Sequence, residues 1–436
     1  MNMKETLRTG ILEATRLVNA GGLREATAKI QRTLRGILSS DAPADIPSAG
    51  ADAPIEGTFR VIDAHSPSAG AETNVPPAGA SRPFARFRAP LHPQPRGDSG
   101  QRPRPTPPSD LARDVEPGGQ FISRSYTNQA GTRTYKLYIP SGYQGKPLPL
   151  IVMLHGCTQS PDDFAAGTRM NRLAEEHQCL VVYPAQARAA NQSNCWNWFN
   201  TADQHRDRGE PCIIAGITLE IISGYAIDTH RVYVAGLSAG GAMAAVMATT
   251  YPDLYAAIGI HSGLPYAVAH DLPSAFAAMH QGAPSPGNDR RDRTSGAGSS
   301  PRAVPTIVFH GDRDTTVHPR NGDHVIAQCM SVHAPNGSDI KAATNPPVTV
   351  QRGQVPDGHA YTRTSYHDPS GQIMLEQWEV HGAGHAWSGG SLGGSYTDPK
   401  GPDATNEMIR FFYEHPHPEP AGKSLAACTS SPMTSH

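Results

Sequence analysis

The sequence predicts an α/β fold in which a mostly parallel β-sheet is covered by helices on both faces. From about residue 120 onward, short runs of β-branched and aliphatic residues alternate with stretches of helical spacing. One run, LPLIVMLHG at 148–156, is apolar at almost every position, as is typical of a central parallel strand buried on both faces. A third observation is a strand-like run at 231–236 that passes through a glycine-rich turn directly into a helical run.

The elements are predicted in the following order. The alternating segment TRTYKLYIP at 132–140 indicates an edge strand that precedes the central strand. Further strands are predicted at 179–184, 231–236, 255–263, 304–311, 361–367 and 373–382. Helices are predicted around 170–176, 213–227, 275, 324–330 and 406–413.

Composition divides the chain into four parts. Residues 1–40 carry apolar positions at helical spacing on either side of Gly21-Gly22, which predicts an αα-hairpin. Residues 41–118 are rich in proline, alanine, serine and glycine without periodicity, which predicts a disordered linker. Residues 119–415 form the predicted catalytic domain, and 416–436 a flexible tail.

Charge and hydropathy exclude several classes of partner. The formal net charge of −2 does not indicate a nucleic-acid partner. No apolar run approaches the roughly 18 residues that would predict a membrane span. The first residues lack the continuous apolar stretch of a secretory signal peptide. The hairpin at residues 3–38 is expected to serve docking or self-association without chemistry, with membrane or granule binding as the alternative.

The six cysteines show no C-x-x-C pair and no metal-ligand spacing, so no metal site is predicted. Cys195 and Cys212 flank a polar segment, which leaves two interpretations open. They close a disulfide-bonded loop, or the cysteines are unpaired thiols in a reducing compartment.

A candidate nucleophile lies in the turn GLSAGG at 236–241. A strand before and a helix after are the context that a nucleophile elbow requires, and only small neighbours fit such a turn. We therefore predict that Ser238 is the nucleophile. The alternative is a loop that merely contains small residues.

A serine hydroxyl needs a base, and the base needs an orienting carboxylate. Ligands bind at the carboxyl ends of strands in open α/β sheets, and suitable residues follow two later strands. Asp314 is predicted to orient the base, with Asp312 as the alternative. His385, on a loop flanked by glycines, is predicted to be the base, with His381 as the alternative.

The oxyanion hole is predicted from backbone amides. The N–H of Ala239 follows the nucleophile, and the N–H of Cys157 follows the strand that ends at His155-Gly156. His155 is expected to shape this loop rather than to transfer protons. Three tryptophans are candidates for an apolar acyl pocket: Trp196, Trp198 and Trp387. Core packing is the alternative for Trp196 and Trp198, whereas Trp387, two residues past the predicted base, is the better pocket candidate.

The motifs LHGCTQ, CWNWF, GLSAGGAM, HGDRDTTV and GAGHAWSGGSLGGSYTDPKGPDAT resemble those of the polyhydroxybutyrate depolymerase-type esterases, of the α/β hydrolase superfamily. The resemblance covers residues 122–415. It implies Ser238 as nucleophile, Asp314 as orienter, His385 as base and the Cys157 amide in the oxyanion hole, with no cofactor. It also implies an extracellular esterase of short-chain polyhydroxyalkanoates. The absence of a visible signal peptide leaves a cytoplasmic location as the alternative.

Other functions stay open at this point. Feruloyl and acetylxylan esterases are related, so the ester substrate is either a hydroxyalkanoate or a plant-cell-wall ester. A peptidase of the same fold would use the same three residues. The alternative to an enzyme is a non-catalytic protein that binds a granule or a partner.

Overall fold

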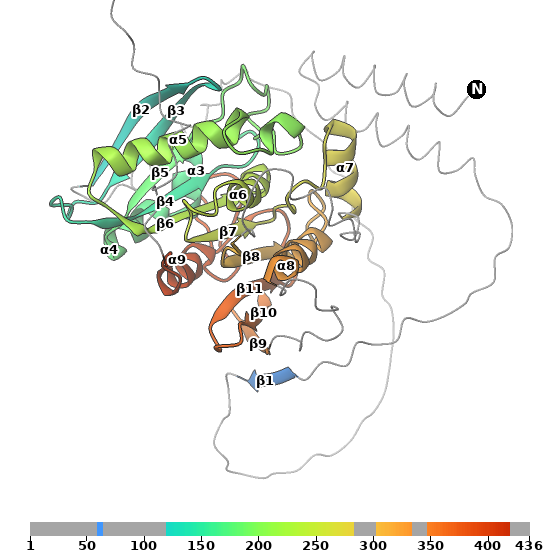
Figure 1. Cartoon of the computed structure of the whole chain (residues 1–436). Coiled ribbons are helices and arrows are strands. Elements are labelled where there is room, and N and C mark those ends of the chain that lie inside the picture. The colour runs from blue at the N-terminus through green and yellow to red at the C-terminus, as the bar shows by residue number, and fades with distance from the viewer. Residues whose placement is uncertain (1–58, 64–118, 283–301, 334–346, 419–436) are drawn as a thin grey trace, which may run out of the picture. The chain divides into compact units, whose positions relative to one another are not determined.

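The computed structural model of the chain describes residues 59–63, 119–282, 302–333 and 347–418 (Figure 1). The predicted hairpin at 1–40 lies outside these ranges, as does the predicted linker at 41–118 apart from residues 59–63.

The described strands form one 11-stranded sheet with the order β1-β9-β10-β11-β8-β7-β6-β4-β5-β3-β2. Neighbouring strands from β11 to β5 pair in parallel, and the pairs β5–β3, β3–β2, β10–β11 and β9–β10 are antiparallel. The bounds are β1 Phe59–Asp63, β2 Gln120–Asn128, β3 Gly131–Ile139, β4 Leu148–Leu154, β5 Leu180–Pro184, β6 Ile227–Leu237, β7 Ala257–His261, β8 Thr306–Gly311, β9 Val348–Gln354, β10 Ala360–His367 and β11 Ile373–Val380. Two short strands, β12 Trp387–Ser388 and β13 Thr397–Asp398, pair separately.

Helices cover both faces of the sheet (Figure 1). The helices α5, α6, α7 and α8 pack on one face, and α3, α4 and α9 on the other. Their bounds are α3 Pro161–Thr168, α4 Met170–His177, α5 Gly209–Gly224, α6 Ala239–Thr250, α7 Leu272–Gln281, α8 Arg320–His333 and α9 Ala404–Glu414. The predicted fold class is therefore confirmed. No described helix has the length and apolarity that crossing a membrane would demand.

The strand β4 explains why the sheet needs two layers of helices. Leu150 and Val152 belong to the core on the α5 and α6 side, whereas Ile151 and Met153 belong to the core on the α9 side. All four side chains are fully buried. An apolar residue at every position of a strand can be buried only when both faces of the sheet are covered.

The sheet edges differ from the sequence prediction. The strand β3 is not an edge strand, because β2 pairs along its whole length and covers it. Neither β2 nor β9 was predicted, since both are half-exposed and lack a strong apolar pattern. The strand β1, inside the range predicted as linker, pairs in parallel with β9 and was also not expected.

The folded part extends past the predicted boundary at residue 415. His417 is buried, its N–H donates to the His230 carbonyl at 2.7 Å, and its imidazole lies 3.1 Å from the Pro252 carbonyl oxygen. Residues 416–418 therefore continue the domain along β6.

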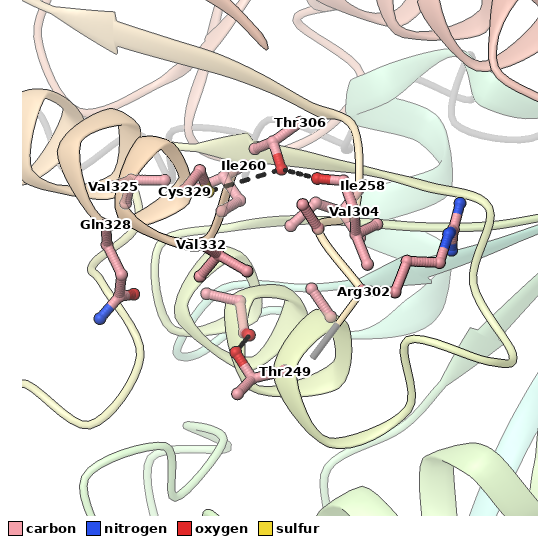
Figure 2. Close-up of a pocket in the computed structure, with 13 residues that line it drawn as sticks. Thr249, Ile258, Ile260, Arg302, Val304, Thr306, Val325, Gln328, Cys329 and Val332 are labelled. Carbon is pink, nitrogen blue, oxygen red and sulfur yellow. Dashed lines mark hydrogen bonds between the residues drawn. The ribbon is translucent and has the colours of Figure 1, made fainter. Parts of the chain in front are cut away.

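A small apolar cavity of about 70 Å³ lies between α6, α8 and the first residues of β7 and β8 (Figure 2). Its lining includes Ile258, Val304, Val325 and the thiol of Cys329, which donates to the Thr306 hydroxyl at 3.7 Å. Parallel strands place their reactive loops at their carboxyl ends. This cavity is at the amino ends of β7 and β8, so it is not the candidate site.

Candidate active site

Ser238 occupies the junction between β6 and α6 in a backbone conformation that non-glycine residues rarely adopt, with φ 58° and ψ −119°. A Cβ atom on Gly240 would overlap the carbonyl oxygen of Leu154, and one on Gly236 would overlap the backbone of Gly240. The turn is therefore closed to larger residues at these two positions. It holds a nearly buried serine at the carboxyl end of the sheet.

The structure brings Asp314 and His385 together. The Nδ1 atom of His385 lies 2.6 Å from Oδ2 of Asp314, and Oδ1 of Asp314 accepts the N–H groups of Thr316 and Val317 at 2.8 Å each. An ionised carboxylate can only accept, so Nδ1 of His385 carries the proton. The remaining nitrogen, Nε2, is then the basic one.

A further histidine supports this carboxylate. The Nε2 atom of His310 donates to the Val317 carbonyl at 2.9 Å and lies 3.4 Å from Oδ2 of Asp314. Burial raises the pKa of Asp314, but the hydrogen bonds from His310 and His385 outweigh it and hold that pKa well below its ordinary value. Asp314 is therefore a buried anion facing His385.

His261 connects the serine to the loop that bears His385. Its carbonyl accepts the N–H of Ser238 at 2.9 Å, and its Nε2 accepts the N–H of Ser388 at 2.9 Å. The ring stacks on Trp387 with 5.0 Å between ring centroids. Burial lowers the pKa of His261 to about 3, so the imidazole is neutral. Ser388, three residues beyond the predicted base, is thus linked through His261 to Ser238 in the elbow.

The predicted oxyanion loop lies beside the serine. A Cβ atom on Gly156 would stand 3.6 Å from the Cβ of Ser238. The next amide along the chain is that of Cys157, and Ala239 is the first residue of α6. Within the described ranges, neither of these two amide N–H groups has a protein acceptor. Both remain available to a ligand at the serine.

Together these contacts place a serine, a histidine–aspartate pair and two unengaged amides at one end of the sheet.

The chain is similar in sequence to esterases of known families. Residues 133–344 match the family model described as esterase PHB depolymerase. Poly(3-hydroxyalkanoate) depolymerase C of Paucimonas lemoignei is 33% identical over 271 residues, 61% of this chain and 60% of the relative. A probable acetylxylan esterase A of Aspergillus fumigatus is 31% identical, over 50% of this chain and 59% of the relative.

Feruloyl esterase B of Neurospora crassa is 32% identical over 49% of this chain and 74% of the relative. The chain belongs to the polyhydroxybutyrate depolymerase-type esterase family. Among solved structures, an acetyl xylan esterase from Aspergillus awamori matches with a TM-score of 0.50 at 21% identity, over 67% of this chain and 99% of that one. At this identity the match supports the α/β hydrolase fold alone. The chain spans only 60% and 59% of the length of the first two relatives.

In this member of the family the disulfide differs from the one left open by the sequence. Cys157 pairs with Cys195, so a Cys195–Cys212 loop is wrong. Cys212 is a buried thiol outside any disulfide, and it accepts a hydrogen bond from the Asn128 amide at 3.4 Å. Spacing along the chain could not identify the pair, because the partner cysteines meet through the approach of two loops. The bond ties the residue that carries the predicted oxyanion N–H to the 185–200 loop.

The three tryptophans proposed for an acyl pocket are buried in this chain. Trp196 and Trp387 are fully buried and Trp198 is 5% exposed. Trp387 donates from its indole nitrogen to the Thr405 hydroxyl at 2.9 Å, and Trp196 packs against His155. This burial agrees with the alternative of core packing for Trp196 and Trp198, and it does not support Trp387 as the better pocket candidate. We therefore assign no substrate contact to the three.

The alternative residues Asp312 and His381 form a separate pair. The Nδ1 atom of His381 lies 3.1 Å from Oδ2 of Asp312, and the N–H of Gly382 donates to Oδ1 of Asp312 at 2.7 Å. With Glu379 they are the one group in the described ranges whose ligand atoms could hold a metal ion. Asp312 and Glu379 are exposed, and both oxygens of Asp312 already accept hydrogen bonds, so we assign no metal to the group.

Sequence reasoning missed His261, His310 and Gln186, all of them buried beside the site. A signal existed for the two histidines, because each lies within the last two residues of a strand and is followed within two residues by a glycine. Gln186 carries no comparable pattern. Its role depends entirely on the contacts that folding creates.

Proposed function

We propose that the chain is a serine esterase that hydrolyses short-chain polyhydroxyalkanoates, or related carboxylic esters, through an acyl-enzyme. Ser238 is the nucleophile, His385 the base and Asp314 its orienter. The amides of Cys157 and Ala239 form the oxyanion hole. The observation that carries the proposal is the 2.6 Å contact between His385 and the buried anion Asp314. His385 lies on a loop that is linked through His261 to Ser238.

The chemistry follows from these positions. The Ser238 hydroxyl oxygen attacks the ester carbonyl carbon while Nε2 of His385 accepts its proton. The carbonyl oxygen becomes an oxyanion that accepts from the two amides. The carbon–oxygen bond to the alcohol breaks, and the alcohol leaves with the proton from His385. Water then attacks the acyl-enzyme through the same histidine, which releases the acid and restores Ser238.

The substrate class rests on the relatives. The depolymerase from Paucimonas lemoignei matches the longest stretch of this chain among the relatives described above, which favours a hydroxyalkanoate ester. The acetylxylan and feruloyl esterases match a shorter stretch and make plant-cell-wall esters the second candidate. The fold alone cannot choose between them. A disulfide within the site supports a location outside the reducing cytosol.

The first prediction tests the nucleophile. Ser238→Ala should abolish covalent labelling by a fluorophosphonate probe and lower kcat/KM for p-nitrophenyl butyrate by at least about 10⁴-fold, with an unchanged circular dichroism spectrum. Ser331→Ala removes an exposed hydroxyl on α8 and should behave like the wild type. Labelling that persists in the Ser238 variant would locate the nucleophile elsewhere.

The same preparation identifies the substrate. Values of kcat/KM are compared for a hydroxybutyrate trimer, acetylated xylan, methyl ferulate and a peptide amide. We expect the trimer to be hydrolysed most efficiently. A preference for xylan or ferulate would assign the chain to plant-cell-wall esters, and amide cleavage would make it a peptidase. A folded wild type that turns over none of them would favour the non-catalytic alternative.

A further inference from the structure

The segment at 156–158 is held by hydrogen bonds on both sides of a single unengaged amide. The N–H of Gly156 donates to Oε1 of Gln159 at 2.9 Å, and the N–H of Thr158 donates to the Ser193 carbonyl at 2.7 Å. Within the described ranges the intervening N–H, that of Cys157, has no protein acceptor. The direction of the Cys157 N–H is therefore set by the groups that hold the peptide bond between Gly156 and Cys157.

That peptide bond joins Gly156 to Cys157, and its carbonyl oxygen belongs to Gly156. A trans peptide is planar, so its C=O and N–H point in opposite directions and rotate as one unit. Nδ1 of His155 lies 2.8 Å from this carbonyl oxygen. A donor held at this oxygen consequently aims the Cys157 N–H on the other side of the plane.

The other nitrogen of His155 decides the direction of this hydrogen bond. The backbone N–H of Gln186 lies 3.1 Å from Nε2 of His155 and can only donate, so Nε2 is an acceptor. In a neutral imidazole the proton is then on Nδ1, and His155 donates to Gly156. Burial lowers the pKa of His155, which favours the neutral form.

Gln186, whose N–H donates to His155, also supports the other side of the segment at 156–158. The side-chain amide of Gln186 donates to the Cys195 carbonyl at 2.8 Å, and Cys195 is the disulfide partner of Cys157. That amide also donates to the buried carboxylate of Glu210. The imidazole of His155 and the disulfide therefore hold Cys157 from two sides, and both are hydrogen-bonded through the buried Gln186.

We propose that His155 is a positioning residue whose Nδ1–H group aims the Cys157 N–H at the oxyanion. The proposal rests on the proposed esterase function. His155 is 1% exposed and packs against Trp196, so it acts through the peptide plane and not by contact with the substrate. An imidazole suits this role because it accepts from Gln186 on one side and donates to Gly156 on the other.

Two substitutions separate these two hydrogen bonds. In His155→Asn, the amide nitrogen occupies about the position of Nδ1, so the donor to Gly156 is kept and the acceptor for Gln186 is lost. In His155→Gln, the amide oxygen occupies about the position of Nε2, so the acceptor is kept and the donor is lost. Each variant removes one contact of the same buried ring.

The experiment measures kcat, KM and the thermal midpoint of both variants with p-nitrophenyl butyrate. We expect His155→Gln to lower kcat by about 10-fold to 100-fold with KM within about threefold of the wild type, because the lost interaction matters in the transition state. His155→Asn should keep a kcat closer to that of the wild type. A kcat of His155→Gln equal to or above that of His155→Asn, when both are folded, overturns the proposal.

A second measurement on the wild type decides the proposal even where a variant does not fold. The imidazole ¹⁵N shifts of His155, assigned by their absence in a variant, should report a proton on Nδ1. A proton on Nε2 overturns the proposal. Wild-type turnover separates this result from the proposed function, because an inactive wild type with the Nδ1–H tautomer contradicts the esterase and leaves the hydrogen bond in place.

Discussion

At the scale of single residues, the two aspartates that follow β8 have different surroundings. Asp314 is buried, accepts two backbone N–H groups on one oxygen and faces His385 and His310 with the other. Asp312 is partly exposed and accepts from Gly382 and His381. The sequence predicted these separate roles from the position of each aspartate relative to the end of the strand. Only the first can orient His385.

The second prediction compares the two aspartates. In Asp314→Asn the amide nitrogen would meet the N–H of His385, so the imidazole must take the opposite tautomer and its Nε2 can no longer accept the serine proton. Turnover should fall by about 10⁴-fold, as in the Ser-His-Asp template. Asp312→Asn should lower turnover by less than about tenfold. Hydrolysis rates at a temperature where both variants are folded decide this, and a silent Asp314→Asn would refute the assignment.

At the scale of elements, the carboxyl ends of four strands carry a repeated pattern. A histidine followed within two residues by glycine lies directly after β4 (His155), at the end of β7 (His261), one residue before the end of β8 (His310) and directly after β11 (His381). The first three are buried. Each of these three uses at least one ring nitrogen to hold a loop that carries a catalytic candidate. The pattern is visible in the sequence, but the partner of each ring emerges only when the strands are aligned in the sheet.

The loops of the site were predicted less completely than its strands. The central strands β4, β6, β7 and β8 are apolar and bounded by glycine, so their positions follow from the sequence. The edge strand β2 and the strand β9, next to the opposite edge, were missed because their side chains are half-exposed and their pattern is weak. The Cys157–Cys195 pair was also missed, since a disulfide depends on a spatial approach that spacing does not encode.

The third prediction concerns this disulfide. Cys195→Ser should lower the free energy of unfolding by about 2–4 kcal/mol, because the bond no longer restricts the unfolded chain. It should also lower kcat more than it raises KM, since Cys157 loses one of its two supports. Peptide mapping without reduction should recover the Cys157–Cys195 pair.

Cys212→Ser is the matched control, because Cys212 is a cysteine outside the Cys157–Cys195 disulfide. This variant should retain the wild-type kcat and the Cys157–Cys195 peptide. An equal loss of kcat in both variants would contradict the role of the disulfide in the site.

At the scale of the whole molecule, a buried histidine in the central sheet links folding to protonation. His261 belongs to the strand β7, and its ring stacks on Phe309 and on Trp387. Its ring carries one hydrogen bond from Ser388 and lies 3.2 Å from the Ser262 hydroxyl. A protonated ring would lose the acceptor for Ser388 and would bury an unpaired charge. Folding therefore favours the neutral imidazole, which links the stability of the molecule to pH.

The fourth prediction follows from this linkage. The pKa of His261 is about 3 in the folded protein, against about 6.5 in an unfolded chain. Between these values the unfolded state binds a proton that the folded state does not, so the free energy of unfolding decreases as pH is lowered from about 6.5. At pH 5 this histidine alone should contribute about 2 kcal/mol of destabilisation relative to pH 7.5.

His261→Gln tests this contribution, because the amide oxygen can still accept the N–H of Ser388 and the side chain does not titrate. Urea unfolding at pH 7.5 and pH 5 should show that the variant loses about 2 kcal/mol less stability than the wild type over this interval. The exposed His270 provides the control, and His270→Gln should preserve the wild-type pH dependence. An equal loss in His261→Gln and the wild type would mean that His261 does not link folding to pH.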